Sequence, residues 1–141
     1  MPTITRSLCL VALLAFAGCV TSWDSGYRPN TQETLDIYAA VLRSRLSRTP
    51  LPPHRDLYLF VERNVDTALA QRFRNYHVII RSGFSDASPP HARWYYLRMG
   101  RYTPGKAYVM VNAVEWSGHI VELRKRKGIW SVVDDREIII L

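Results

Sequence analysis

Four histidines are the side chains best suited to hold a metal ion or to move a proton. They are His54, His77, His91 and His119. A local metal site on one element needs ligands a few positions apart, and no two of these histidines are three or four positions apart. We therefore expect no metal and no other cofactor, and we expect His77 and His119 to occupy ordinary half-buried strand positions. A ligand set gathered from distant positions is the alternative.

Asp134 and Asp135 are the closest pair of carboxylates in the chain. Consecutive residues of a strand point to opposite faces of the sheet, so the two could act together only at a bulge or a turn. The plainer interpretation is a solvated kink flanked by Arg136. The alternative is an enzyme whose site gathers both aspartates and a histidine from dispersed positions.

The sequence contains no other recognisable catalytic motif. Ser82 and Ser85 lie in a glycine-containing segment without the G-x-S-x-G elbow, and the glycines form no phosphate-binding fingerprint. A two-residue turn at 117–118 would pair Glu115 with Ile120, which keeps Glu115 and Glu122 apart. We predict no catalytic residues.

Two segments are candidates for binding. The first places four positive charges at an expected hairpin tip, and consists of Arg124, Lys125, Arg126 and Lys127. The second interleaves aromatic rings with arginines, a composition favoured at interfaces, and consists of Arg93, Trp94, Tyr96 and Arg98. The plainer alternatives are a solvated tip whose charges deter edge-to-edge pairing, and a strand that buries alternate aromatics and exposes alternate arginines.

The segment LCLVALLAFAGC, residues 8–19, is an apolar run that ends in small residues and a cysteine. The apolar stretch from Leu8 to Val20 is shorter than the roughly 20 residues that span a bilayer as a helix. It also lacks the polar stripe of a helix packed on a core. One positive charge at Arg6, an apolar stretch and small residues at its end predict a secretory signal peptide.

The end of this segment, Phe16-Ala17-Gly18-Cys19, resembles the lipobox of bacterial lipoproteins. The resemblance implies that residues 1–18 are removed and that the sulfur of Cys19 receives a diacylglycerol. In that family an aspartate after the acylated cysteine tends to retain the protein in the inner membrane. Val20 stands at this position, which implies the outer membrane.

Ordinary signal peptidase offers a rival site after Ala17, and an uncleaved anchor is a third possibility. The cysteine count favours the lipoprotein, because Cys19 is the one cysteine left once the segment with Cys9 is removed. Ordinary cleavage would leave that thiol unpaired in an oxidising compartment, whereas lipidation uses it.

The remaining chain predicts a short tether over residues 19–29 and one α+β domain over residues 30–141. The formal charge of +7 favours acidic partners. In an exported protein we expect these to be anionic lipid headgroups, an acidic envelope polymer or an envelope protein. We expect no nucleic acid, because the sequence carries no recognition motif for it.

Asn30 and Glu33 form a capping-box pattern before an amphipathic helix over residues 31–46, which ends at the proline-rich residues 50–53. Asp66 is expected to cap a short helix over residues 67–73. Strands are expected over residues 57–61, 76–80, 93–99, 107–116, 119–126, 129–133 and 138–141, with a loop over residues 82–90. This order predicts the first helix packed on a curved antiparallel sheet that ends in a β-meander.

The final segment, RKRKGIWSVVDDREIIIL, resembles the terminal hairpin of small envelope domains of the nuclear-transport-factor-2-like or cystatin-like kind. Such folds host enzymes and binding modules alike, so the likeness bears on the fold alone. We expect a non-catalytic binding or assembly module, anchored by lipid at the periplasmic face of the outer membrane. The alternatives are the dispersed Asp/His enzyme and an immunity or inhibitor lipoprotein directed against an envelope-targeted toxin.

Overall fold

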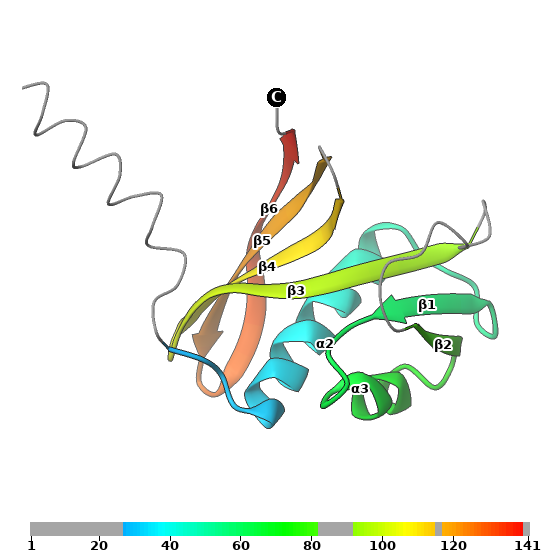
Figure 1. The fold of residues 1–141 in the computed structure, drawn as a ribbon, viewed down its shortest axis with the longest axis horizontal. Coiled ribbons are helices and arrows are strands. Elements are labelled where there is room, and N and C mark those ends of the chain that lie inside the picture. Colours follow the sequence, from blue (N-terminus) through cyan, green and yellow to red (C-terminus); the bar gives the residue numbers. More distant parts are fainter. Residues whose placement is uncertain (1–26, 82–91, 115–116, 140–141) are drawn as a thin grey trace, which may run out of the picture.

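The computed structural model describes residues 27–81, 92–114 and 117–139. Two helices and six strands follow one another in the order α2 (Thr31–Arg48), β1 (Asp56–Phe60), α3 (Asp66–Arg72), β2 (His77–Arg81), β3 (Arg93–Thr103), β4 (Lys106–Val114), β5 (Ser117–Arg126) and β6 (Ile129–Ile139). The expected signal peptide, Cys19 and the expected loop over residues 82–90 lie outside the described residues. The α+β class is confirmed, with one sheet and helices packed against it (Figure 1).

Helix α2 begins where the sequence predicts. The side chain of Asn30 accepts a hydrogen bond of 2.8 Å from the amide of Glu33, which satisfies one of the free N–H groups of the first turn. Arg45 and Arg48 lie in the last turn, where positive charge suits the helix dipole. The helix runs two residues beyond the predicted Leu46 and ends before Pro50.

The sheet is mixed, which corrects the prediction of an antiparallel sheet. Its strand order is β2-β1-β3-β4-β5-β6, and β1 pairs in parallel with both β2 and β3. Parallel neighbours need a crossover connection, and α3 provides one between β1 and β2. The N-cap of α3 is Val65, while Asp66 lies in the first turn and its side chain hydrogen-bonds the amide and hydroxyl of Thr67.

Strands β3 to β6 form the predicted meander with three changes of boundary. Strand β3 continues to Thr103. Val114 of β4 lies opposite Ser117, so residues 117–118 belong to β5 and the predicted turn there is wrong. The two predicted terminal strands are one continuous strand, β6, with a bulge at the register shift between its pairs with Glu122 and Leu123.

One hydrophobic core joins both helices to one face of the sheet. Ile37, Tyr38, Val41 and Leu42 of α2 are fully buried, and they belong to the same cluster as Leu69 of α3. The sheet twists strongly, so β6 crosses the direction of β1 at a wide angle and α2 lies along the inner face (Figure 1). The buried members of this cluster lie between residues 35 and 130, so a fragment of residues 22–141 retains the described core. No helix in the described ranges is long and apolar enough to cross a membrane.

Candidate functional site

The predicted hairpin tip is a tight turn between β5 and β6. Lys127 and Gly128 both have positive φ, at 51° and 77°, and Arg126 lies opposite Ile129. Two central residues with positive φ match the twist of a two-residue hairpin, and glycine tolerates this conformation without strain. The turn places the cations of residues 124–127 at one end of the sheet.

Lys125 is tied to the helix and is not a free cation of the tip. Its Nζ lies 2.9 Å from Oε1 and 3.1 Å from Oε2 of Glu33, in the first turn of α2. The hydroxyl of Tyr102 also donates to Glu33, at 3.4 Å, and the ring of Trp130 lies 5.8 Å from Lys125 Nζ. The hydrogen bond to Glu33 raises the pKa of Lys125, and desolvation opposes that shift. Lys125 was predicted to be one of four tip cations available for binding, but its charge is already paired with Glu33.

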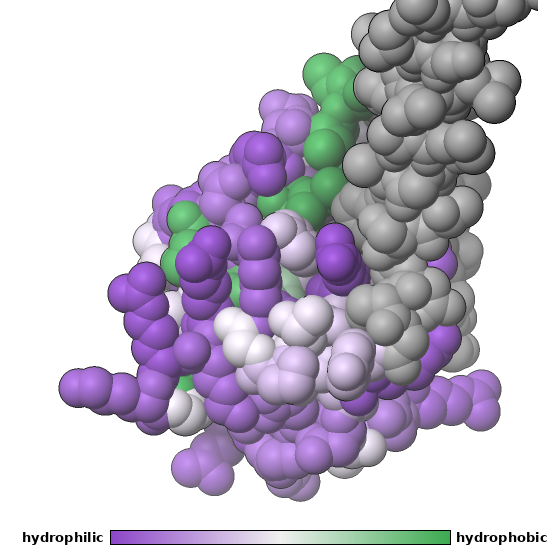
Figure 2. Space-filling view, turned by 90° about the vertical axis from the view of Figure 1, so that its left-hand side faces the viewer, coloured by the Kyte–Doolittle hydropathy of each residue, from purple (hydrophilic) through white to green (hydrophobic). Residues whose placement is uncertain are grey.

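The other cations of this end remain directed to solvent. Arg124 makes an exposed contact of 3.3 Å with Glu122, and no ion pair to a described residue is found for Arg126 or Lys127. We call this region the basic end and define it by its exposed arginines and lysine, which are Arg28, Arg101, Arg124, Arg126 and Lys127. Figure 2 shows hydrophilic side chains over the lower end of the molecule, with hydrophobic ones gathered toward the upper end.

The side chains of the second candidate segment, on β3, lie in different environments. Arg93 donates a hydrogen bond of 2.7 Å to the carbonyl of Thr49, the C-cap residue of α2, so it belongs to the inner side. Trp94 meets Phe60 edge to face, with 6.4 Å between ring centroids. Tyr95 and Leu97 are buried in the core, whereas Tyr96 is half-buried and Arg98 is exposed. The structure therefore does not join this segment and the hairpin tip into one surface.

Asn112 fixes the point where β4 departs from β3. It has a left-handed φ of 51° and lies at an irregularity of the β4–β5 pairing. Its side chain accepts a hydrogen bond of 2.8 Å from the amide of Tyr96 and donates one of 3.3 Å to the carbonyl of Trp94. A side-chain amide thus replaces the backbone groups that a regular strand would supply.

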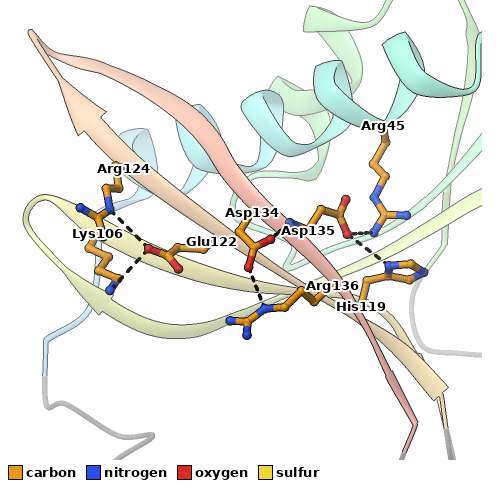
Figure 3. A network of polar contacts seen from close by, with 8 residues as sticks. All are labelled: Arg45, Lys106, His119, Glu122, Arg124, Asp134, Asp135 and Arg136. Carbon is orange, nitrogen blue, oxygen red and sulfur yellow. Dashed lines mark hydrogen bonds and ion pairs between the residues drawn. The ribbon is translucent and has the colours of Figure 1, made fainter.

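Asp135 forms a buried cluster that sequence analysis missed. Its side chain is 2% exposed, and Oδ1 lies 2.8 Å from Arg45 Nη2 and 3.1 Å from His119 Nδ1 (Figure 3). Oδ2 lies 3.3 Å from Arg48 Nη1, outside hydrogen-bonding geometry. The prediction of a solvated kink is wrong for Asp135. It holds better for Asp134, which is 43% exposed and pairs with Arg136 at 2.7 Å.

An aspartate beside a histidine is also part of the machinery of general base catalysis. His119 is half-buried, as predicted, and directs Nδ1 to Asp135. Two guanidinium groups share the same carboxylate, however, and Arg45 joins the helix to the sheet through it. We interpret the cluster as a structural ion pair that fixes β6 against α2. The prediction of a half-buried strand position is wrong for His77, which is exposed at the start of β2. It lies 2.8 Å from Asp56 and takes no part in the cluster.

A cavity of about 670 Å³ lies beside β3, on the side where β1 has ended. Strand β1 pairs with β3 only as far as Tyr96, so the second half of β3 has a described strand on one side alone. Tyr27, Arg28, Glu62, Asn64 and Arg98 are among the lining residues. Of the predicted binding residues, Arg98 is the one that lines this cavity.

No group of three potential metal ligands is found among the residues that the structure describes. Comparison with protein-family models, with curated proteins and with solved structures gave no match.

Proposed function

We propose that the chain is a lipid-anchored protein of the bacterial envelope, held by Cys19 at the periplasmic face of the outer membrane. In this proposal it acts there as a binding or assembly module without catalytic activity. Two features of the sequence support the anchor: the lipobox-like Phe16-Ala17-Gly18-Cys19, and the position of Cys19 as the one cysteine after residue 18.

The observation that carries the proposal is the place of the basic end relative to the tether. The described chain starts at Tyr27 and enters α2 at Thr31, and Glu33 in the first turn of α2 holds Lys125 of the hairpin tip. Tyr27 lies eight positions after Cys19, and an extended chain over eight positions reaches about 28 Å. A lipid on Cys19 would therefore keep the basic end close to the headgroups.

Charge adds a physical reason for this orientation. The exposed cations of the basic end would lie near anionic headgroups, where each contributes on the order of 1 kcal/mol when it is close to the surface. Salt screens such attraction over about 8 Å at physiological ionic strength, so only the tether-side cations would benefit. The opposite end of the domain would then remain available to a partner in the periplasm.

The contacts of Asp135 favour a binding role over the dispersed Asp/His enzyme. The aspartate that such an enzyme would need is engaged by Arg45, Arg48 and His119 inside the fold. Asp135 is 2% exposed and its Oδ1 is already shared by Arg45 and His119, so this carboxylate is directed into the fold and not toward a substrate.

For the fold, we propose a nuclear-transport-factor-2-like or cystatin-like arrangement for part of the domain only. The wrapping of β3 to β6 around α2 supports the likeness, whereas the parallel unit β1-α3-β2 departs from it. We treat the meander and α2 as the part that resembles those folds.

Acylation is tested by growing cells with labelled palmitate and comparing the natural chain with Cys19→Ser. We expect label on the natural chain alone, with the variant either unprocessed or released into the soluble fraction. Label that persists on the variant would contradict the lipoprotein proposal.

The role of the basic end is tested with the fragment of residues 22–141 and vesicles that contain phosphatidylglycerol. The triple variant Arg124→Gln, Arg126→Gln and Lys127→Gln keeps Lys125, because Lys125 supports the fold through Glu33. A matched control, Arg43→Gln, Arg55→Gln and Arg74→Gln, removes three exposed charges elsewhere. We expect salt-sensitive vesicle binding to fall in the first variant and to persist in the control. Equal losses would show that only net charge matters.

A further inference from the structure

The cavity beside β3 is lined by one carboxylate, that of Glu62, whose position is fixed by a hydrogen bond from the buried core. The hydroxyl of Tyr38 donates a hydrogen bond of 2.7 Å to Oε1 of Glu62. Tyr38 is completely buried, and its hydroxyl reaches Glu62 at the edge of the core. Burial, together with the charge of Glu62, raises the pKa of Tyr38, so the hydroxyl remains a donor. Glu62 itself is exposed and lines the cavity, and among the described residues a hydrogen bond is found to its Oε1 alone.

The same cavity also presents two guanidinium groups. Arg28 and Arg98 both line it, and both are exposed. Within the described part of the chain neither makes an ion pair. Guanidinium groups bind phosphate through paired N–H donors with well-defined geometry. The cavity therefore offers sites for negative charge and, separately, one site for positive charge.

This combination selects a class of ligand. A purely anionic ligand would be drawn to Arg28 and Arg98 but would meet the negative charge of Glu62. A ligand that carries a phosphate and, a few bonds away, a primary ammonium would satisfy both kinds of group. A volume of about 670 Å³ lies within the usual range for small-molecule sites and leaves room beside such a headgroup.

The position of the cavity indicates where such a ligand would come from. Tyr27 and Pro29, the first described residues after the tether, form part of its wall, and Met99 and Met110 add apolar surface. We propose that this cavity binds the zwitterionic phosphoethanolamine headgroup of a membrane phospholipid, with the phosphate at Arg28 and Arg98 and the ammonium at Glu62. The choice of a lipid rests on the proposed function, because the tether is what brings this wall to the membrane.

The test uses the full chain in a neutral detergent and water-soluble headgroups as probes. Titration calorimetry compares glycerophosphoethanolamine with glycerophosphoglycerol, which has no ammonium, and with inorganic phosphate. A charged hydrogen bond between ammonium and carboxylate predicts that glycerophosphoethanolamine binds about ten-fold more tightly than glycerophosphoglycerol. Equal binding of these two probes, or tighter binding of inorganic phosphate, would overturn the proposal.

Variants assign the two halves of the site. Glu62→Gln keeps an oxygen that can accept the Tyr38 hydroxyl, so the fold is retained while the preference for the ammonium probe is lost. Arg98→Gln should weaken both phosphodiester probes together, whereas Arg136→Gln, on another part of the sheet, should change neither. A preference that survives in Glu62→Gln would exclude the assigned role of Glu62.

These measurements do not depend on the lipid anchor. If palmitate labelling fails but the ammonium preference is present, the site exists and its ligand is not delivered by a tether. If labelling succeeds and the preference is absent, the anchor holds and the cavity assignment is wrong.

Discussion

Asp134 and Asp135 are consecutive residues of β6, but they lie on opposite faces of the sheet and have different surroundings. Asp134 is 43% exposed and pairs with Arg136 two residues away. Asp135 is 2% exposed and binds Arg45, 90 positions away in the sequence, together with His119. The outer pair belongs to a solvated surface that also includes Lys106, Glu122 and Arg124 (Figure 3). The inner cluster fastens the edge strand to the helix.

The bulge in β6 decides which aspartate points inward. Trp130 and Val132 face the core, and simple alternation from them would turn Asp134 inward and Asp135 outward. The register shift adds Val133 as an extra residue, opposite neither Leu123 nor Glu122. Val133 is 48% exposed, and after it the alternation is reversed. One extra residue therefore converts a surface charge into an internal one.

We expect the largest effect when each aspartate is replaced by asparagine and the losses in the free energy of unfolding are compared. Asp135→Asn removes the charge that Arg45 needs, and the side chain of Arg45 is only 17% exposed. Breaking a buried ion pair from one side costs about 3 kcal/mol, whereas an exposed pair contributes less than about 1 kcal/mol. We therefore expect urea unfolding of the fragment of residues 22–141 to show a large loss for Asp135→Asn and little for Asp134→Asn. Similar losses would refute the structural role of Asp135.

The two arginines that contact Asp135 should also differ in their contribution to stability, with the more buried one contributing more. Arg45 is 17% exposed and hydrogen-bonded to Asp135, whereas Arg48 is 57% exposed and lies 3.3 Å away. Arg45→Gln should cost about 2 kcal/mol and Arg48→Gln less than about 0.5 kcal/mol. A double-mutant cycle with Asp135→Asn measures the coupling directly. A stronger coupling to Arg48 than to Arg45 would reverse the assignment.

The ion pair between Lys125 and Glu33 extends the comparison to pH. The folded state raises the pKa of Lys125 above its ordinary value of 10.5, chiefly through the hydrogen bond to Glu33. Stabilisation from this lysine is therefore fully present below pH 10.5 and is lost as the pH rises through the higher folded pKa. We expect the stability difference between the natural chain and Lys125→Gln to shrink above that pH.

Lys127→Gln serves as the matched control for this titration. Lys127 is exposed at the turn, and no ion pair to it is found in the described ranges. Its stability difference from the natural chain should be small at every pH between 7 and 11. A pH-independent difference for Lys125→Gln would mean that the contact with Glu33 contributes through packing and not through charge.

Local patterns predicted the helix and most strands because those signals depend on neighbouring residues. The Asn30 cap, the helical spacing from Leu35 to Leu46 and the turn at Lys127 and Gly128 are all present in the structure. Strand order is not a local property, since an apolar run does not reveal which strand lies beside it. The parallel pairing of β1 with β2 and β3 was missed for that reason.

The residues of the candidate sites were predicted less well, because their roles depend on distant partners. Lys125 and Glu33 are 92 positions apart, so the free tip expected from four consecutive cations could not reveal their ion pair. The cavity joins Arg28, Glu62 and Arg98, which no spacing rule connects. A group of charged residues at a strand end predicts a charged surface. The fold decides which of these charges are already neutralised by an ion pair with a distant residue.

The smallest expected effect concerns the bulge itself. Deleting Val133 gives the same sequence as deleting Val132, and the shortened strand alternates without a bulge while Asp135 still faces inward. Because the removed residue is exposed and pairs with no residue of β5, we expect a stability change of no more than about 1 kcal/mol. The decisive measurement is Asp135→Asn in the deleted chain, which should still cost as much as in the natural chain. If that substitution becomes nearly neutral, Asp135 has turned outward, and the bulge does more than reset the alternation of the strand.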